Sequence, residues 1–394
     1  MDTTTVGISQ ELRCTRSVAA PSRPRRPIAA SAQPARLEPL GAAFEVRLGQ
    51  QAETARLWQV RGAGAGPRVV FVEQDSFFQR DGIYGQAGAD YADNARRFAF
   101  FTLAALEALP RLAPAPAVLH AHDWHTALAP VYLRTALAGE AYFDAMLLGV
   151  ANGIEPRVWD PATDPYIAAC YSVDDLSGKA RCKTALQRAY GLPVRARTPL
   201  VGMCARLVAQ KGFDLVLGGA LRSMPEAQFV FVGQGEERYA RALSELAAAA
   251  RERIAMHVGF TDAREHRLLA GADLLLMPSL YEPCGLTQMR AQRYGTIPVG
   301  RRVGGLADTI EDDVTGFLFD EYSPAALERA LRRALDRYRD PATWFTYIRA
   351  AMSRPFGWER PMAQYANLYA RALHLRRPHD GARRDADPVG ASRT

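Results

Sequence analysis

The sequence predicts an α/β protein whose second half is built on a parallel sheet of the nucleotide-binding type. Short apolar runs in this half have the length of buried strands. They lie at residues 199–204, 228–232, 254–258, 274–277, 297–299 and 317–319. Helical stretches separate them, at residues 213–222, 237–251, 264–270, 286–294 and 324–338. Strands and helices that alternate in this way form right-handed βαβ units, which give a parallel sheet.

The first half shows similar elements with weaker signals. Residues 44–48 alternate between apolar and polar, as in a half-buried strand, and residues 69–72 form a short apolar run. Residues 94–109 have the spacing of a helix with one apolar side. A buried strand is expected at 117–119, and a helix at 126–137.

The composition describes a globular protein and excludes several classes. Of 394 residues, 48% are hydrophobic and 23% are charged, which rules out a disordered chain, a collagen-like polymer and a small disulfide scaffold. No run approaches the roughly 18 apolar residues that span a bilayer, so we expect no membrane association. The net charge is +7, and the excess of arginine gathers near the two ends. We therefore expect solvated tails and no nucleic-acid partner.

We divide the chain into four parts. Residues 1–40 are rich in proline and arginine, and we expect a disordered extension or a misassigned start, with an organelle transit peptide as the alternative. Residues 41–148 and 149–375 form two domains, and residues 376–394 form a disordered basic tail. Five cysteines without a CxxC pair favour a reducing compartment. We expect a cytoplasmic protein.

Two cations stand in the turn after the first strand of the second half. Ligands of such sheets bind beyond the carboxyl ends of the strands. Arg206 and Lys211 lie five residues apart there, next to the start of a helix. A guanidinium, an ammonium and a helix N-terminus together suit a diphosphate. A solvated basic loop is the alternative.

The turn after the fourth strand combines a carboxylate with a free backbone. Glu282 stands near the strand end, and Gly285 allows a ligand to approach the backbone. A helix from about Leu286 would direct its first amides toward an anion. We interpret Glu282 as a group that holds hydroxyls of a sugar attached to that phosphate; the alternative is a charge that stabilises the helix dipole. Gly304 and Gly305 begin a third turn of this kind. The alternative is that these glycines only allow the backbone to turn.

Three histidines and an aspartate follow the strand at 117–119, in the string His120-Ala-His-Asp-Trp-His125. A metal site is one interpretation. We prefer polar side chains that reach a sugar, with Trp124 packed beneath them, because no Glu/His helix motif follows. The chain contains neither a Gly-x-Ser-x-Gly elbow nor a Walker loop, which argues against serine hydrolases and P-loop proteins.

Together, these motifs resemble those of bacterial glycogen synthases and plant starch synthases, the glycosyltransferases that elongate α-1,4-glucan. The resemblance covers nearly all of residues 68–375. The matching strings are His120-Ala-His-Asp-Trp-His125, Asn152-Gly-Ile154, Trp159-Asp-Pro161, Gly178-Lys-Ala-Arg-Cys-Lys183, Arg206-Leu-Val-Ala-Gln-Lys-Gly212, His266-Arg267, Ala270-Gly-Ala-Asp273, Pro278-Ser-Leu-Tyr-Glu-Pro-Cys-Gly-Leu-Thr-Gln288, Arg293-Tyr-Gly-Thr-Ile-Pro298, Gly304-Gly-Leu-Ala-Asp-Thr309 and Thr315-Gly-Phe317.

The resemblance implies the GT-B fold, in which two Rossmann-like domains border a cleft. It implies ADP-glucose as donor, an α-glucan as acceptor and retention at the anomeric carbon. No metal or cofactor is implied, because Arg206 and Lys211 would neutralise the departing diphosphate. Glu282 would lie near the donor glucose, and Asp123 in the cleft on the acceptor side. The implied donor-binding residues are Gly285, Leu286, Thr287 and Phe260, the last against the adenine.

The chain departs from the family pattern in its first domain. The family's Lys-x-Gly-Gly-Leu loop has no counterpart before residue 42. Only 18 residues separate Leu133 from Asn152, where the family has a longer stretch with a His-Asn loop. We therefore expect an incomplete Rossmann-like domain over 41–148, without its opening strand. The alternative function is a nucleotide-sugar-binding or regulatory protein without turnover, and UDP-glucose is the alternative donor.

Overall fold

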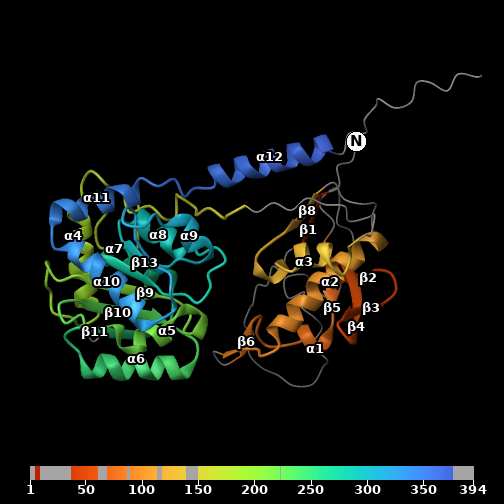
Figure 1. Cartoon of the computed structure of the whole chain (residues 1–394), viewed down its shortest axis with the longest axis horizontal. Helices are drawn as coiled ribbons and strands as arrows, with labels where there is room; N and C mark the ends of the chain where they lie inside the picture. Colours follow the sequence, from red (N-terminus) through yellow and green to blue (C-terminus); the bar gives the residue numbers. More distant parts are fainter. Residues whose placement is uncertain are drawn as a thin grey trace, which may run out of the picture. The chain divides into compact units, whose positions relative to one another are not determined.

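The computed structural model describes residues 5–8, 37–60, 69–86, 89–112, 118–138, 150–221 and 223–375. The chain forms two compact units, each assembled from separate stretches of sequence (Figure 1). The first unit consists of Met1–Arg80, Asp93–Gly149 and Ala363–Thr394, and the second of Asp81–Ala92 and Val150–Met362. Among the described residues, no helix has the length and apolar character needed to cross a membrane.

The second unit is built on a six-stranded parallel sheet. Its strands are β9 (Leu200–Cys204), β10 (Gln228–Gly233), β11 (Ile254–Val258), β12 (Leu274–Met277), β13 (Ile297–Arg301) and β14 (Phe317–Phe319). They lie side by side in the order β11-β10-β9-β12-β13-β14. Counted from β9, this is the order 3-2-1-4-5-6 of dinucleotide-binding domains. The order reverses between β9 and β12, where sheets of this type bind ligands.

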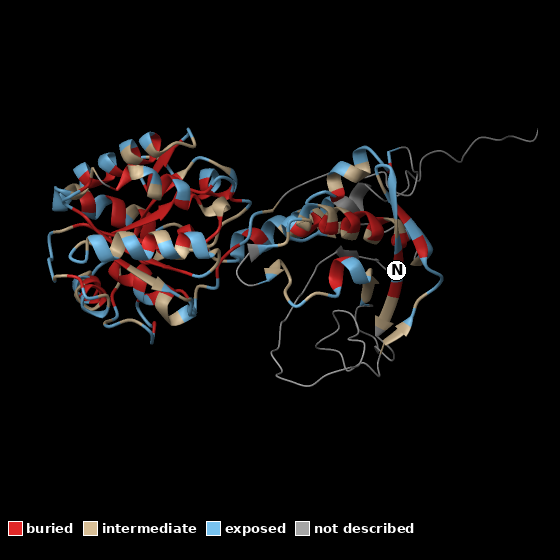
Figure 2. Cartoon of the chain, turned by 90° about the horizontal axis from the view of Figure 1, so that it is seen from below, coloured by how far each residue is buried: buried red, intermediate tan, exposed pale blue. Residues whose placement is uncertain are grey.

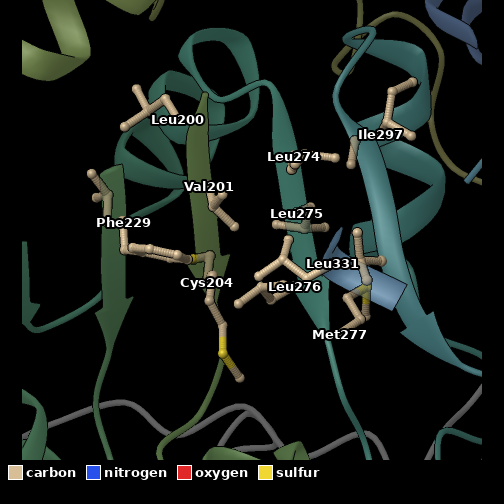
Figure 3. Packing of buried hydrophobic residues seen from close by; sticks show 14 of the residues in the cluster. Leu200, Val201, Cys204, Phe229, Leu274, Leu275, Leu276, Met277, Ile297 and Leu331 are labelled. Carbon is tan, nitrogen blue, oxygen red and sulfur yellow. The ribbon is translucent and has the colours of Figure 1, made fainter. Parts of the chain in front are cut away.

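The strands of this sheet are continuous apolar runs because both faces of the sheet are covered. Every residue of β9, β10, β12 and β14 is buried, although successive side chains of a strand point to opposite faces. Val201, Leu275 and Ile297 belong to one large core cluster (Figure 3). Buried residues also run along the inner sides of the surrounding helices (Figure 2). Polar side chains therefore gather at the strand ends, where ligands can reach them.

Most helical segments of the second unit connect these strands. The segments are α4 (Ser177–Ala189), η4 (Ala209–Lys211), α5 (Phe213–Leu215), the π-helical η5 (Val216–Ala220), α6 (Glu237–Ala249), α7 (Asp262–Gly271), α8 (Thr287–Arg293), α9 (Gly304–Thr309), α10 (Pro324–Tyr338) and α11 (Pro341–Met352). Of these, α4 precedes β9, and α10 and α11 follow β14. Side chains of Thr261, Ser323 and Asp340 cap the starts of α7, α10 and α11. The last helix, α12 (Glu359–Leu375), belongs to the first unit from Ala363 onward, which differs from the predicted domain 149–375.

The first unit contains an antiparallel sheet and a parallel strand pair. In the antiparallel sheet, β4 pairs with each of the other three strands; the four are β2 (Leu37–Pro39), β3 (Phe44–Leu48), β4 (Gln51–Val60) and β5 (Val70–Glu73). The parallel pair joins β1 (Thr5–Ile8) to β8 (Val118–Ala121). The helices are α1 (Asp75–Phe78), α2 (Asn94–Leu112), η2 (Trp124–Thr126) and α3 (Ala129–Arg134). Buried side chains of α2 join the core of this unit.

The N-terminal end differs from the prediction. Thr5–Ile8 and Leu37–Pro39 are strands, although we expected residues 1–40 to have no structure and the first domain to lack its opening strand. Pairing with β8 satisfies backbone groups of β1, and a partner so distant in the chain leaves no trace in local composition. The rest of the predicted extension, and the predicted tail at 376–394, lie outside the described residues.

Candidate functional site

A cavity of about 330 Å³ opens at the carboxyl ends of β9 and β12, where the strand order reverses. Arg206, Lys211, Phe260 and Thr287, all singled out from the sequence, line it. The other lining residues are Met203, Cys204, Ala205, Gln234, Glu265, Leu276, Met277, Ser279 and Arg290. The structure thus brings the two cations, the aromatic ring and the first residue of α8 around one hollow.

Glu282 is buried beside this cavity and holds Lys211. The Lys211 Nζ donates to Glu282 Oε2 at 2.5 Å, and the Ser279 Oγ donates to the same oxygen at 3.0 Å. Glu282 is only 6% exposed. Within the described part of the chain, nothing donates a hydrogen bond to its other oxygen, Oε1. A hydroxyl group of a ligand can therefore bind Oε1 without breaking the ion pair.

The two loops that carry these groups are fastened to each other. The side-chain amide of Gln210 donates to the carbonyl of Tyr281, and the amide of Leu280 donates to the carbonyl of Gln210, both at 2.8 Å. Gly212 has a φ of 77°, and a Cβ there would meet the carbonyl oxygen of Pro278 at 1.9 Å. Only glycine permits this approach. The backbone therefore fixes the distance between the lysine and the carboxylate.

Arg206 lines the cavity directly after β9. Its Nη1 lies 3.4 Å from the Asp90 Oδ1, and its guanidinium carbon lies 5.9 Å from the centre of the Tyr84 ring. Asp90 belongs to β7 (Ala89–Asp90), which pairs with β6 (Gly85–Gln86) in the Asp81–Ala92 segment of the second unit. Both charged side chains are about half exposed, so their contact contributes little. The guanidinium can exchange this partner for a stronger anion.

The turn before α8 presents backbone amides. Gly285 has a φ of 69°, and a Cβ there would meet the side-chain amide of Gln288 at 2.5 Å. No described residue accepts a hydrogen bond from the backbone amides of Gly285 and Leu286. Neither of these two predicted residues belongs to the cavity lining, whereas the next residue, Thr287, does.

The Gly304–Gly305 pair supports the turn that carries Glu282. The amide of Gly305 donates to the carbonyl of Glu282 at 2.9 Å. A Cβ at Gly305 would meet the carbonyl oxygen of Cys284 at 1.8 Å, and a Cβ at Gly304 would meet that of Glu282 at 2.2 Å. The two glycines are therefore needed for a close approach of two backbone segments, and their part in the site is indirect.

A partly buried ion pair that sequence reasoning missed also lines the cavity. The Arg290 Nη1 donates to both carboxylate oxygens of Glu265, at 3.0 and 3.1 Å. Its guanidinium carbon lies 4.1 Å from the centre of the Trp159 ring. The two charged residues come from different helices, so their spacing in the chain gives no local pattern. The available signal was that each is the fourth residue of a helix that follows a strand end at the ligand-binding edge.

Only one of the three lysines belongs to this site. The ammonium of Lys179 is buried and donates to the carbonyls of Ala270, Ala272 and Tyr294 and to the Thr296 hydroxyl. The Lys183 ammonium lies 2.7 Å from the Asp273 carboxylate. A compact ammonium can meet several converging acceptors that a planar guanidinium would not fit. The scarcity of lysine thus marks structural positions as well as Lys211.

Asp123 belongs to the first unit and is not among the residues that line the cavity. Its φ is 62°, unusual for a residue other than glycine. Its side chain caps η2 by accepting from the amide of Trp124 at 2.7 Å. The neighbouring His120 and His122 rings lie 3.8 Å apart, and burial, followed by the charge of His122, lowers the pKa of His120. Among the described residues, no three His, Cys, Asp or Glu side chains gather to hold a metal ion.

Known protein families match the two halves of the chain separately. Residues 10–148 match the starch synthase catalytic domain, and residues 191–350 match glycosyl transferases group 1. The glycogen synthase of Anaeromyxobacter dehalogenans (strain 2CP-1) is 38% identical, with 84% of this chain and 87% of the relative covered. That of Syntrophotalea carbinolica is 35% identical, with 86% and 88% covered.

A solved structure shares the fold over most of the chain. It is the catalytic domain of starch synthase IV from Arabidopsis thaliana, bound to ADP and acarbose. The TM-score is 0.59 at 26% identity, with 86% of this chain and 88% of that chain covered. The alignment with the Anaeromyxobacter relative runs over 425 positions, more than the 394 residues of this chain. That relative therefore contains segments that have no counterpart here.

Proposed function

Because this chain belongs to the family of bacterial glycogen synthases and plant starch synthases, we propose that it transfers glucose from ADP-glucose to the end of an α-1,4-glucan. It is a glycosyltransferase, and the likeness to starch synthase IV confirms the predicted GT-B fold. The observation that carries the proposal is the cavity where Arg206, Lys211 and Thr287 meet beside Glu282. The sequence has five cysteines and no CxxC motif, which favours a reducing compartment. We therefore include a cytoplasmic location in the same proposal.

The two cations give the cavity its proposed role toward the diphosphate. Negative charge grows on the departing ADP as the bond to glucose breaks, and fixed positive groups stabilise that charge most when they are already in place. Lys211 is held by Glu282 and by the backbone of its loop. Arg206 needs only to release a half-exposed contact to Asp90. With these two charges, the proposed reaction requires neither a metal nor a cofactor.

Glu282 would act on the sugar end of the donor. Its Oε2 is occupied by Lys211 and Ser279, so Oε1 is left to accept hydrogen bonds from donor hydroxyls. In the proposed transfer, the bond between the anomeric carbon and the diphosphate oxygen breaks, and its electron pair leaves with ADP. The acceptor 4-hydroxyl oxygen bonds to the same side of that carbon, as the family resemblance implies. The hydroxyl proton is released with the ADP.

Incorporation of labelled glucose from ADP-glucose into glycogen tests this function. We expect the purified full chain to add label to glycogen, and to do so faster with ADP-glucose than with UDP-glucose. Protein that unfolds cooperatively on heating yet incorporates no label from either donor would overturn the catalytic proposal. In that event, ADP binding measured by calorimetry would identify a nucleotide-binding protein without turnover, and its absence would reject that alternative too.

Replacing Arg206 with alanine should weaken ADP binding by about 1.5–3 kcal/mol, the contribution of a charge-assisted hydrogen bond. Calorimetry with ADP measures this change. Arg195→Ala is the matched control, because Arg195 is also about half exposed and also contacts one carboxylate, that of Glu252, but does not line the cavity. An unchanged dissociation constant in Arg206→Ala would remove Arg206 from the site.

A further inference from the structure

The Glu265–Arg290 pair occupies a particular place along the cavity. Glu265 lies in α7, five residues after Phe260, and Arg290 lies in α8, three residues after Thr287. All four of these residues line the cavity. If the diphosphate lies at Thr287 and the base against Phe260, as the family resemblance implies, each residue of the pair comes shortly after one of these two ends along the chain. The part of a nucleoside diphosphate that joins base to phosphate is the ribose. The pair is therefore placed beside the ribose.

The pair also has hydrogen-bonding groups that no described protein group uses. A single atom, the Arg290 Nη1, serves both carboxylate oxygens of Glu265. The Arg290 Nε is buried and has no hydrogen-bond partner among the described residues. Glu265 is only 4% exposed. Burial of charges with incomplete hydrogen bonding is costly. The Arg290 side chain is 22% exposed, so ligand hydroxyls can bind the open side of its guanidinium and relieve part of this cost.

A vicinal diol has the chemistry that this arrangement lacks. Each hydroxyl can donate one hydrogen bond and also accept one. A carboxylate accepts from the diol, and a guanidinium about 3.0 Å away donates to it. The ring of Trp159 below the guanidinium fixes the orientation of that donor. An acceptor and a donor thus lie side by side, the combination that two adjacent hydroxyls can bind.

We propose that Glu265 and Arg290 recognise the 2′,3′-diol of the donor's ribose and make the site specific for ribonucleotides. This inference rests on the proposed function, since it takes a nucleoside diphosphate as the ligand of the cavity. It does not depend on which base the nucleotide carries. The two residues are specificity-determining groups and take no part in the bond-breaking step.

The first test varies the ligand and leaves the protein unchanged. Calorimetry on the full chain compares ADP with 2′-deoxy-ADP and 3′-deoxy-ADP. We expect each deoxynucleotide to bind about tenfold or more weakly, because a missing hydroxyl leaves a charged group without its partner. UDP and 2′-deoxy-UDP should show the same ratio. Equal binding of ADP and both deoxynucleotides would overturn the inference.

The second test removes the pair. The double variant Glu265→Leu/Arg290→Met replaces both charges together, which avoids leaving one buried charge unpaired. It should bind ADP more weakly and should bind ADP and 2′-deoxy-ADP equally, within about twofold. The matched control is Glu252→Leu/Arg195→Met, the same exchange at an exposed pair, which should keep the wild-type ratio. If the double variant does not fold, Arg290→Lys serves instead. Lysine keeps the charge but lacks the planar set of guanidinium donors, so it should reduce the preference for ADP over 2′-deoxy-ADP.

If the folded variants still prefer ADP over the deoxynucleotides as strongly as the wild type does, the pair has a structural role and the inference is overturned. The failure of the proposed function looks different. A wild-type chain that binds neither ADP nor UDP would overturn both proposals together. A chain that binds ADP without regard to the ribose hydroxyls would overturn this inference alone.

Discussion

A Glu282→Gln variant should transfer glucose from ADP-glucose about 10²–10³-fold more slowly than the unchanged chain, the usual cost of removing one electrostatic group from a transition state. Positive charge develops at the anomeric carbon during glycosyl transfer, as it does in glycoside hydrolysis, and a carboxylate stabilises it. Glutamine keeps the shape of the side chain and can accept from Ser279 as Glu282 does. The loss should therefore appear in kcat, measured as labelled glucose incorporated at saturating donor.

Binding of ADP separates this result from misfolding. Glu282→Gln removes the ion-pair partner of Lys211, so the ammonium becomes more available to a diphosphate, and ADP should bind at least as tightly as before. Glu252→Gln is the matched control, since Glu252 is exposed and lies outside the cavity lining. Transfer by Glu282→Gln within a factor of ten of the control would contradict the role that we propose for the carboxylate.

Replacing Lys179 with methionine should cost about 3 kcal/mol of unfolding free energy, because buried acceptors lose their donor. The three hydrogens of the ammonium are shared among four oxygens, which converge on it from α7, the turn after α7 and the residues after α8, at 2.9–3.2 Å. Methionine fills the space but donates nothing. Urea unfolding at pH 7 measures the loss, with Arg181→Met, an exposed substitution in the same helix, as control.

The cost of this substitution should also depend on pH. Burial lowers the pKa of Lys179 to about 8 from 10.5, and the nearby Asp273 opposes that lowering. Between these values the unfolded chain holds the proton and the folded chain does not, so this lysine makes stability rise with pH through that window. Below pH 8 both states are charged and the slope vanishes. The difference in unfolding free energy between wild type and Lys179→Met should thus grow by about 2 kcal/mol from pH 8 to 9.5.

Burial raises the pKa of Tyr171, Tyr294 and Tyr338 above the ordinary value. Tyrosines therefore also make stability depend on pH in alkaline solution, equally in both proteins, and only the difference between wild type and variant isolates the lysine. A difference that stays constant from pH 7 to 9.5 would show that Lys179 keeps its ordinary pKa in the folded chain. A loss of stability at pH 7 no larger than that of Arg181→Met would show that water or neighbouring donors replace the ammonium.

The sheet of the second unit was predictable because its strands are buried on both faces. The run predicted at 228–232 is β10, and that at 254–258 is β11. The helices were harder to predict. Residues 213–222 break into α5 and the π-helical η5, where Gly219 has a φ of 108°. The helix α11 was missed, although a capping Asp340 and a proline at its first position are ordinary start signals.

Some residues of the site could likewise be predicted from the sequence, and others could not. Arg206, Lys211 and Thr287 could be placed in advance because each follows the end of a strand, and that position alone brings them to one edge. Glu265 and Arg290 could not, because their contact depends on how two helices pack. Their roles toward a ligand stay predictions, to be decided by the variants described above.

The interleaved course of the chain restricts how this protein can be divided by recombination. A crossover between residues 149 and 150 would separate the second unit from Asp81–Ala92, which supplies the Asp90 that contacts Arg206. It would also deprive the first unit of the end of α12, where the Tyr369 hydroxyl lies 3.3 Å from the His120 ring. Neither half can be exchanged with a relative as one contiguous gene fragment. We expect the two units to be inherited together.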